Sequence, residues 1–430
     1  MDRRIRFAVC GIVAAATSLA LVPTATRPEE VGFSSERLQR VHEAVQRHID
    51  AHDVAGVVTL VARKGRIAFF EANGVMDVDS KRPMPKDAIF RLASMSKPIT
   101  AVAVMMLIEE GRIRLSDPVS KFIPEFKNLN KVAVARPSPV PGGPAQVGPA
   151  AGRGASPAEF DVVSAAREVT VRDLLTHTSG LVSGGLGASA ADRLAPRAPA
   201  DTLSAYIPKL AAVPLDFQPG ALWRYSGLAG FDTLGRIVEV ASGQPFDQFL
   251  RLRIFEPLGM KDTGFSVGPE GASRLPTVYQ HTAEGLVPAP DPNRLISSVY
   301  FSGAGGMLST AADYAQFAQM LLNGGQLNGK RFLSPKTVEL MTSNHTGEMV
   351  NGQFGRPAHG MGFGLGVQVV LDPVAADLRV SPGTFGWAGA YGCNANMDPK
   401  ENMLTVIMMQ TASGALQRDF ENAAWQAIVE

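Results

Sequence analysis

A serine and a lysine, Ser94 and Lys97, stand three positions apart at the start of the most apolar stretch of the chain. The residues that follow, 99–108, are apolar nearly all the way round a helix. This pattern predicts a helix buried on every face and beginning at about Ser94, with both polar side chains on one face. A serine hydroxyl is a weak nucleophile that needs a neighbouring base, and a desolvated lysine can be that base. The pair indicates covalent catalysis; the structural alternative is a helix cap beside a solvated lysine.

Two other polar groups lie at junctions between expected elements. Tyr225 stands just before an apolar helical pattern at 231–241. A tyrosine can act as an acid or base when a nearby lysine keeps its phenolate accessible. Trp387 and Gly389 lie among late strand-like runs, where a glycine-spaced strand edge can offer a backbone N–H to an oxyanion. Taken singly, each of these features is more typical of packing than of catalysis.

Strand-like runs at both ends of the chain enclose a long helical stretch. Runs at 55–62 and 67–72 predict a hairpin, and runs at 365–371 and 403–409 are also strand-like. Helical patterns such as 201–212 fill the middle. We therefore expect an α/β fold of the α+β type, with a mostly antiparallel sheet built from both chain ends, flanked by helices, and an all-helical domain inserted. The expected parts are α/β residues 27–115, helical residues 116–294 and α/β residues 295–430.

Residues 136–160 interrupt this organisation. Proline, glycine and alanine dominate the segment, and no apolar periodicity runs through it. Such a composition cannot bury enough surface to order itself, which predicts a flexible insertion in a surface loop. The functional alternative is a lid over the site.

The histidines do not indicate a metal centre. His42, His48 and His52 have no third ligand at a suitable spacing, so we expect exposed histidines there. His177 comes where a helix is expected to end, and we interpret it as a cap or turn residue rather than a catalytic one.

Composition and the N-terminal segment bear on partners and location. The chain has 41 basic and 40 acidic residues and a formal charge of +1, with no basic run, so neither nucleic acid nor an anionic membrane is an expected partner. A basic start and an apolar run at 7–21 predict a signal peptide over 1–26, cut near Ala20 or Ala25, although a retained anchor is the alternative. We expect an exported protein, periplasmic or secreted, with no stable membrane insertion after signal removal. Only Cys393 remains in the mature chain, so no intrachain disulfide can form.

The polar groups fall into one order along the chain: Ser94-x-x-Lys97, Tyr225-Ser226 and Trp387-Ala388-Gly389. This order and its rough spacing resemble those of serine β-lactamase-like hydrolases, in the branch of class C β-lactamases and family VIII carboxylesterases. The resemblance covers most of residues 30–430. It implies an α/β domain from both termini, an all-helical domain between them and an active site in their cleft. It implies no metal and no organic cofactor.

The resemblance also implies a role for each site residue. Ser94 would attack the carbonyl carbon. Lys97 and Tyr225 would share the transfer of its proton to the leaving group, and Tyr225 would then help to activate the deacylating water. The backbone N–H groups of Ser94 and Ala390 would form the oxyanion hole.

Departures from the family pattern bear on the substrate. Where β-lactamases and transpeptidases have Lys-Thr-Gly, this chain has Trp387, an alanine and Gly389, so the cation and hydroxyl that grip a substrate carboxylate are missing. Where they have Tyr-x-Asn, this chain has Gly227 in the place of the asparagine, so the asparagine amide is missing as well. We expect Trp387, Gly389 and Gly227 to line the substrate site, with the Trp387 indole as an apolar wall. Both changes favour neutral esters.

The sequence therefore predicts an exported serine hydrolase that cleaves small short-chain carboxylic esters through an acyl-enzyme on Ser94. One alternative is an amide-cleaving relative, either a class C-like β-lactamase or a D-amino-acid peptidase or amidase. A second is a non-catalytic homologue that binds peptidoglycan or assembles with itself, against which the intact Ser94, Lys97 and Tyr225 argue. The natural ester, its acyl length and the oligomeric state stay open.

Overall fold

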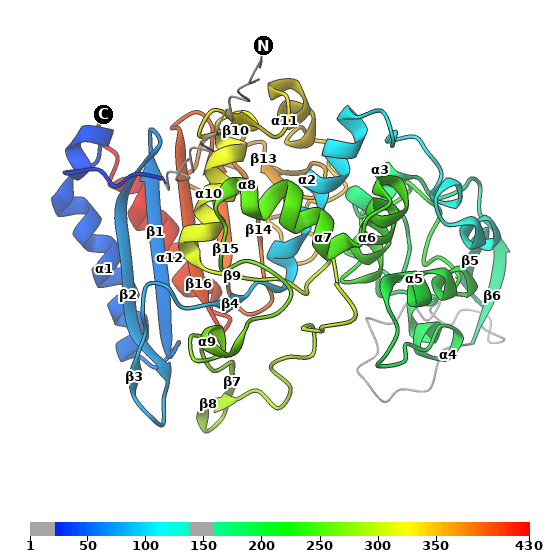
Figure 1. The fold of residues 1–430 in the computed structure, drawn as a ribbon, viewed down its shortest axis with the longest axis horizontal. Coiled ribbons are helices and arrows are strands. Elements are labelled where there is room, and N and C mark those ends of the chain that lie inside the picture. Colours follow the sequence, from blue (N-terminus) through cyan, green and yellow to red (C-terminus); the bar gives the residue numbers. More distant parts are fainter. Residues whose placement is uncertain (1–21, 137–158) are drawn as a thin grey trace, which may run out of the picture.

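The computed structural model describes residues 22–136 and 159–430, and an eight-stranded sheet lies at its centre (Figure 1). The strand order is β12-β13-β14-β15-β16-β1-β2-β3, and every neighbouring pair is antiparallel. The sheet therefore joins the two ends of the described chain, as predicted. Its strands are β1 (Gly56–Arg63), β2 (Arg66–Asp77), β3 (Arg82–Pro83), β12 (Met361–Phe363), β13 (Gln368–Val370), β14 (Phe385–Ala388), β15 (Asn394–Asp398) and β16 (Met403–Met409).

The pairing of β1 with β16 explains why both strands are apolar at most of their positions. The register runs from Val57 opposite Met409 to Arg63 opposite Met403, and every residue of both strands is buried. Strands covered on both faces carry continuous apolar runs instead of alternating ones. The predicted hairpin of β1 and β2 is confirmed beside them.

Helices cover both faces of the sheet (Figure 1). Val57 and Val61 of β1 pack in a core with α1 (Ser35–Asp50) and α12 (Gly414–Gln426), while Val58 and Leu60 belong to the larger core on the other face. The alternation follows from the two-residue repeat of a strand. The second face contacts α10 (Ala311–Leu322).

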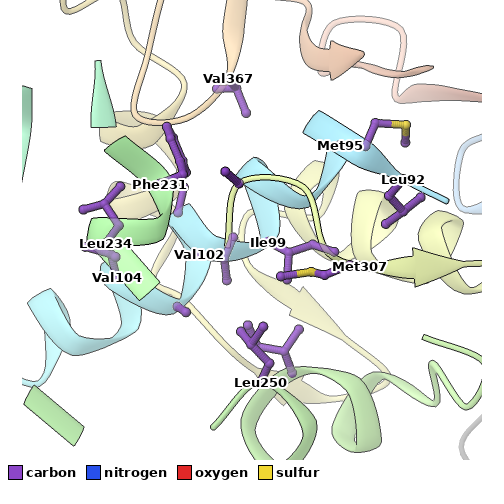
Figure 2. Close-up of a cluster of buried hydrophobic side chains, with 14 of the residues drawn as sticks. Leu92, Met95, Ile99, Val102, Val104, Phe231, Leu234, Leu250, Met307 and Val367 are labelled. Carbon is purple, nitrogen blue, oxygen red and sulfur yellow. The ribbon is translucent and has the colours of Figure 1, made fainter. Parts of the chain in front are cut away.

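The helix that follows Ser94 is α2 (Ser96–Glu109), and it is buried along its length, as predicted. It packs against α6 (Ala229–Ser242). Figure 2 shows Ile99 and Val102 of α2 in one cluster with Phe231 and Leu234 of α6. Packing of this kind supplies most of a helix's stability, so the position of α2 is set by the core around it.

The inserted part is mainly helical but not all-helical, which corrects the prediction. A strand pair, β5 (Lys131–Ala135) with β6 (Phe160–Ser164), flanks the insertion predicted at 136–160. Residues 137–158 of that insertion lie outside the described residues, and its last residue, Phe160, belongs to β6. The β-branched residues of β5 and β6 favour this pairing, and Leu215 donates its N–H to the carbonyl of Lys131 at 2.8 Å. A second pair is β7 (Tyr279–Thr282) with β8 (Gly285–Pro288). Tyr279 of this pair donates its N–H to the carbonyl of Gln410, the residue after β16, at 2.9 Å.

The predicted helix at 201–212 is divided. The α-helical part is α5 (Leu203–Tyr206), and a 3₁₀ helix, Ile207–Ala212, continues from it. Pro208 lies at the start of the second piece, where its missing N–H prevents a continuous α-helical ladder.

The remaining short elements connect these layers. They are β4 (Phe90–Arg91), α3 (Val171–Leu175), α4 (Ala191–Leu194), α7 (Phe246–Leu250), α8 (Glu256–Leu258), α9 (Pro269–Ala272), β7 (Tyr279–Thr282), β8 (Gly285–Pro288), β9 (Leu308–Ser309), β10 (Gln326–Leu327), β11 (Lys330–Arg331) and α11 (Pro335–Met341).

The predicted signal segment 1–26 falls mostly outside the described residues. Its last residues, 22–26, are described. Ala25 donates its N–H to the carbonyl of Ile67, and Ile67 donates its N–H to the carbonyl of Pro23, both at 2.8 Å. Residues 22–26 therefore run along β2. Within the described ranges, no helix has the length and apolar character needed to cross a membrane.

Candidate active site

A strained turn presents Ser94. The α-helix begins at Ser96, two residues later than predicted, and the residues Ala93–Met95 form a 3₁₀ turn before it. Ala93 has φ of 45°, a left-handed conformation that an L-residue adopts at a cost. The residues just before this turn are fixed by the β4–β9 pairing, and Leu92 donates its N–H to the carbonyl of Met307 at 2.9 Å. The backbone around Ser94 is thus fixed by pairing on one side and by the buried helix on the other.

Lys97 lies beneath Ser94 and is only 1% exposed. Its Nζ donates to the carbonyls of Gly227 at 2.8 Å and Ala304 at 2.9 Å, and to Ser94 Oγ at 3.2 Å. An ammonium group has three donors and no acceptor. All three donors of Lys97 are therefore in use, and one of them points at Ser94 Oγ.

Tyr225 completes the predicted group. Its Oη lies 2.7 Å from Ser94 Oγ, and Lys97 Nζ lies 4.9 Å from the centre of its ring. The structure thus brings together Ser94, Lys97 and Tyr225 from three separate segments of the chain. Tyr225 Oη donates to Ser94 Oγ, which also accepts from Lys97 Nζ, so both neighbours direct a proton at the Ser94 oxygen.

Asp232, which the sequence reasoning missed, holds one wall of the site. Its Oδ1 accepts from Ser302 Oγ at 2.6 Å and from the Ala304 N–H at 3.0 Å, while its Oδ2 accepts from Tyr300 Oη at 2.9 Å. Burial raises the pKa of Asp232 above its usual value, and these hydrogen bonds and the charge of Lys97 oppose the rise. The network orients the Ala304 carbonyl toward Lys97. A buried aspartate within the otherwise apolar start of α6 was the signal that could have revealed it.

The end of β14 lies against the Ser94 turn. A Cβ at Gly389 would come within 2.2 Å of the Leu92 carbonyl oxygen, so only glycine fits this approach. The next residue, Ala390, has an N–H with no acceptor in the described part of the chain. That group is placed close to the nucleophile's turn, and its oxyanion role stays a prediction. Gly227 contributes its carbonyl to Lys97, and the space beside its Cα is open.

Trp387 does not form the apolar wall that the sequence predicts. The residue is 4% exposed, and its ring is covered by Tyr225, with ring centres 5.6 Å apart, and by Phe363, at 5.1 Å. The exposed aromatic surface beside Tyr225 comes instead from Phe354, which is 61% exposed with its ring centre 4.4 Å from that of Tyr225. Phe354 belongs to a glycine-rich loop without periodicity, so no sequence signal indicated it.

His177 has the predicted turn role and a packing role as well. It follows α3 with φ of 57°, and its Nδ1 accepts from the Ser226 N–H at 3.3 Å. Its ring centre lies 4.6 Å from that of Tyr225. Burial holds the pKa of His177 well below its usual value, with the charges of Lys97 and Arg356 acting in the same direction, so the ring is neutral beside Tyr225.

Two of the three histidines near the start of the chain contact carboxylates, and the His48 side chain is only 11% exposed, which corrects the expectation of an exposed histidine there. His42 Nδ1 lies 2.8 Å from a Glu71 oxygen, and His48 contacts Asp53 at 2.6 Å and Asp419 at 3.1 Å. Across the described ranges, no group of three or more His, Cys, Asp or Glu side chains is placed to hold a metal ion.

Known proteins match both the sequence and the fold. The family model described as Beta-lactamase matches residues 41–430. The chain belongs to the Beta-lactamase family. Protein Rv1367c of Mycobacterium tuberculosis is 35% identical over 377 residues, covering 85% of this chain and 88% of that one. Esterase EstB of Burkholderia gladioli is 31% identical over 423 residues, covering 92% and 95%. Among solved structures, EstCE1, a hydrolase with promiscuous acyltransferase activity, is similar with a TM-score of 0.73 and 29% identity, covering 91% of this chain and 99% of that chain.

Family membership and these similarities identify the protein as a serine hydrolase of the β-lactamase type. They also agree with the mixed α/β fold built around a large antiparallel sheet.

Proposed function

We propose that this protein is an exported serine hydrolase that cleaves short-chain carboxylic esters through an acyl-enzyme on Ser94. The observation that carries the proposal is the position of Ser94 Oγ, 3.2 Å from Lys97 Nζ and 2.7 Å from Tyr225 Oη. A nucleophile within hydrogen-bond reach of a base, with that base oriented by a third group, is the recurring arrangement for covalent catalysis.

In this mechanism Tyr225 handles the proton and Lys97 supplies charge. Tyr225 acts in its phenolate form beside the Lys97 ammonium. As Ser94 Oγ bonds to the ester carbonyl carbon, its proton passes to the phenolate oxygen of Tyr225, and the carbonyl oxygen becomes an oxyanion. The ammonium of Lys97 stabilises the deprotonated side chains, and the N–H groups of Ser94 and Ala390 stabilise the oxyanion. Tyr225 then gives the proton to the departing alkoxide. In deacylation a water loses its proton to Tyr225, attacks the acyl carbon and releases the acid, and the proton returns to Ser94.

The preference for esters over amides is supported by Ser226, which stands one residue after the catalytic tyrosine. Its Oγ donates to the Leu181 carbonyl at 2.7 Å and accepts from the Gly230 N–H at 3.1 Å. Both bonds are internal to the fold. With Gly227 following it, this segment offers no side-chain amide to hold the acyl-amide group of a β-lactam or peptide. An ester needs no such clamp, because its alkoxide is a better leaving group than the amine of an amide. The similarity to esterase EstB points the same way.

One parallel assay separates this proposal from the alternatives. The purified chain is given 4-nitrophenyl butyrate, a chromogenic cephalosporin and a D-Ala-D-Ala peptide, with Ser94→Ala as the control. We expect kcat/KM for the butyrate to exceed that for the cephalosporin by at least about a hundredfold, a difference of roughly 2.7 kcal/mol in transition-state free energy. Faster cephalosporin or peptide cleavage would instead establish the amide-cleaving alternative, and no turnover at all would favour a non-catalytic homologue.

Export has its own test. Fractionation of producing cells should place the activity in the periplasm or medium, with an N-terminus near residue 21 or 26. Activity confined to the cytoplasm with residues 1–26 retained would contradict it.

A further inference from the structure

Beside Trp387 lies an arginine that no catalytic step above uses. We propose that Arg356 makes this site select esters that carry a carboxylate group. The inference rests on the proposed ester hydrolysis and deepens it by naming the charge class of the substrate. It also changes the expectation of neutral esters that was drawn from the sequence, because Arg356 supplies a cation to the site from a different segment than Lys-Thr-Gly.

Arg356 has no protein partner for its charge. Within residues 22–136 and 159–430 its guanidinium makes no ion pair and no hydrogen bond, and its Nε is buried without an acceptor. Trp387 Nε1, in the ring beneath it, is also a buried donor without an acceptor. Burial lowers the pKa of Arg356 to about 10, and the group remains a cation at neutral pH. Two unpaired buried donors side by side, one of them charged, make a place that an anionic acceptor would satisfy.

The position of Arg356 places this charge at the catalytic tyrosine. Its Cζ lies 4.5 Å from the centre of the Trp387 ring and 5.9 Å from that of Phe354. Both rings contact Tyr225, at 5.6 Å and 4.4 Å between centres. The guanidinium is thus separated from the tyrosine that touches Ser94 by the width of one aromatic ring.

Packing alone explains only part of this arrangement. Stacking on the Trp387 face accounts for where the guanidinium sits. It provides no hydrogen-bond acceptor for the N–H edge of the guanidinium, and Nε has none among the described residues. A carboxylate matches that edge with two parallel hydrogen bonds, which a neutral ester group cannot make. The net charge of the chain is only +1, so any anion preference must come from a local group such as this one.

Matched substrate pairs test the proposal. On the acyl side the pair is 4-nitrophenyl hydrogen adipate and its methyl ester; on the alcohol side it is 3-butyryloxy-4-nitrobenzoic acid and its methyl ester. Release of the nitrophenol gives kcat/KM for each, and the acid-to-methyl-ester ratio isolates the effect of the carboxylate. The enzymes are wild type, Arg356→Gln, Arg356→Lys and Arg193→Gln. The last removes the same charge from an exposed position on α4 and serves as the control.

We expect Arg356→Gln to lower the ratio by about ten- to a hundredfold in one of the two pairs, which also identifies the side of the ester that Arg356 contacts. Arg356→Lys should lower it less, and Arg193→Gln should leave it unchanged. An equal fall in both members of each pair would overturn the proposal, because Arg356 would then only support Trp387. An equal change with Arg193→Gln would overturn it as well.

A second measurement keeps the two proposals distinguishable. If wild type releases nitrophenol from none of the four esters, ester hydrolysis has failed. Protection of Ser94 from a fluorophosphonate probe by adipate then tests Arg356 directly. Protection that Arg356→Gln abolishes supports the anion site, and protection that is absent or unchanged overturns it.

Discussion

The joint action of Lys97 and Tyr225 makes a quantitative prediction. Tyr225→Phe removes the oxygen 2.7 Å from Ser94 Oγ and keeps the ring that packs against its neighbours, so the fold should be nearly unchanged. Loss of a positioned acid–base group typically lowers the rate by about 10²- to 10⁴-fold. Lys97→Met removes the charge and three hydrogen bonds, and its effect on kcat should be of the same size.

The two variants should differ in stability. Lys97→Met leaves the buried carbonyls of Gly227 and Ala304 without their donor, at a cost of about 1 to 3 kcal/mol for each group left unsatisfied. It also leaves the buried carboxylate of Asp232 without the cation that favours its charged form. Denaturant unfolding should therefore show a clear loss for Lys97→Met and little change for Tyr225→Phe.

The double variant decides the mechanism. If the two groups acted independently, their rate losses would multiply to about 10⁴- to 10⁸-fold. Because both act on one proton transfer, we expect the double variant to be at most about tenfold slower than the slower single variant. The assay is kcat/KM for 4-nitrophenyl butyrate, with near-UV circular dichroism to confirm that each variant is folded. Losses that multiply would refute the shared role and the proton path through Tyr225.

Three further predictions follow from the site, the insertion and a buried acid. Ser94→Ala should abolish turnover with an unchanged melting temperature, and a fluorophosphonate should label wild type on the Ser94 peptide alone; label on another serine would contradict the assignment. Deletion of residues 139–157 should leave melting temperature and ester turnover nearly unchanged, because Ala135 and Phe160 are already paired across β5 and β6; lost activity with retained stability would favour a lid. Burial raises the pKa of Glu421 from 4.5 to about 7, so the free energy of unfolding should fall between about pH 4.5 and pH 7, by at most about 3 kcal/mol from this group. Glu421→Gln should flatten that slope in unfolding curves at pH 5 and pH 8, and an unchanged slope would show that the group does not cause it.

The proximity of Ser94 and Lys97 could be predicted from the sequence because its evidence is local. Ser94 and Lys97 are one helical turn apart, and the apolar stretch after them reports the burial of α2 directly. The central strands could be predicted for the same reason, since β1 and β16 are apolar at most of their positions. In these elements the apolar pattern of the sequence agrees with the burial of the same residues in the fold.

The features that were missed depend on contacts distant in sequence. Arg356 and Phe354 lie in a loop with no periodicity, and only the folded chain shows that they meet Tyr225 and Trp387. Burial of Trp387 is also a tertiary property, since its strand pattern does not say which neighbours cover the ring. Residue types can indicate a catalytic group, but they do not indicate which distant loop covers it.

The contact between Arg356 and Trp387 gives the departure from Lys-Thr-Gly a physical meaning. A lysine at position 387 would put a second cation against the Arg356 guanidinium, which now lies 4.5 Å from the ring centre. Two like charges in a mostly buried site repel each other and lose hydration together. An aromatic ring at the same position instead offers the negative face that a guanidinium favours. A lysine at position 387 on β14 and an arginine at position 356 on the loop are therefore alternatives. We infer that the tryptophan does not remove positive charge from this site but moves its source from β14 to the loop that holds Phe354.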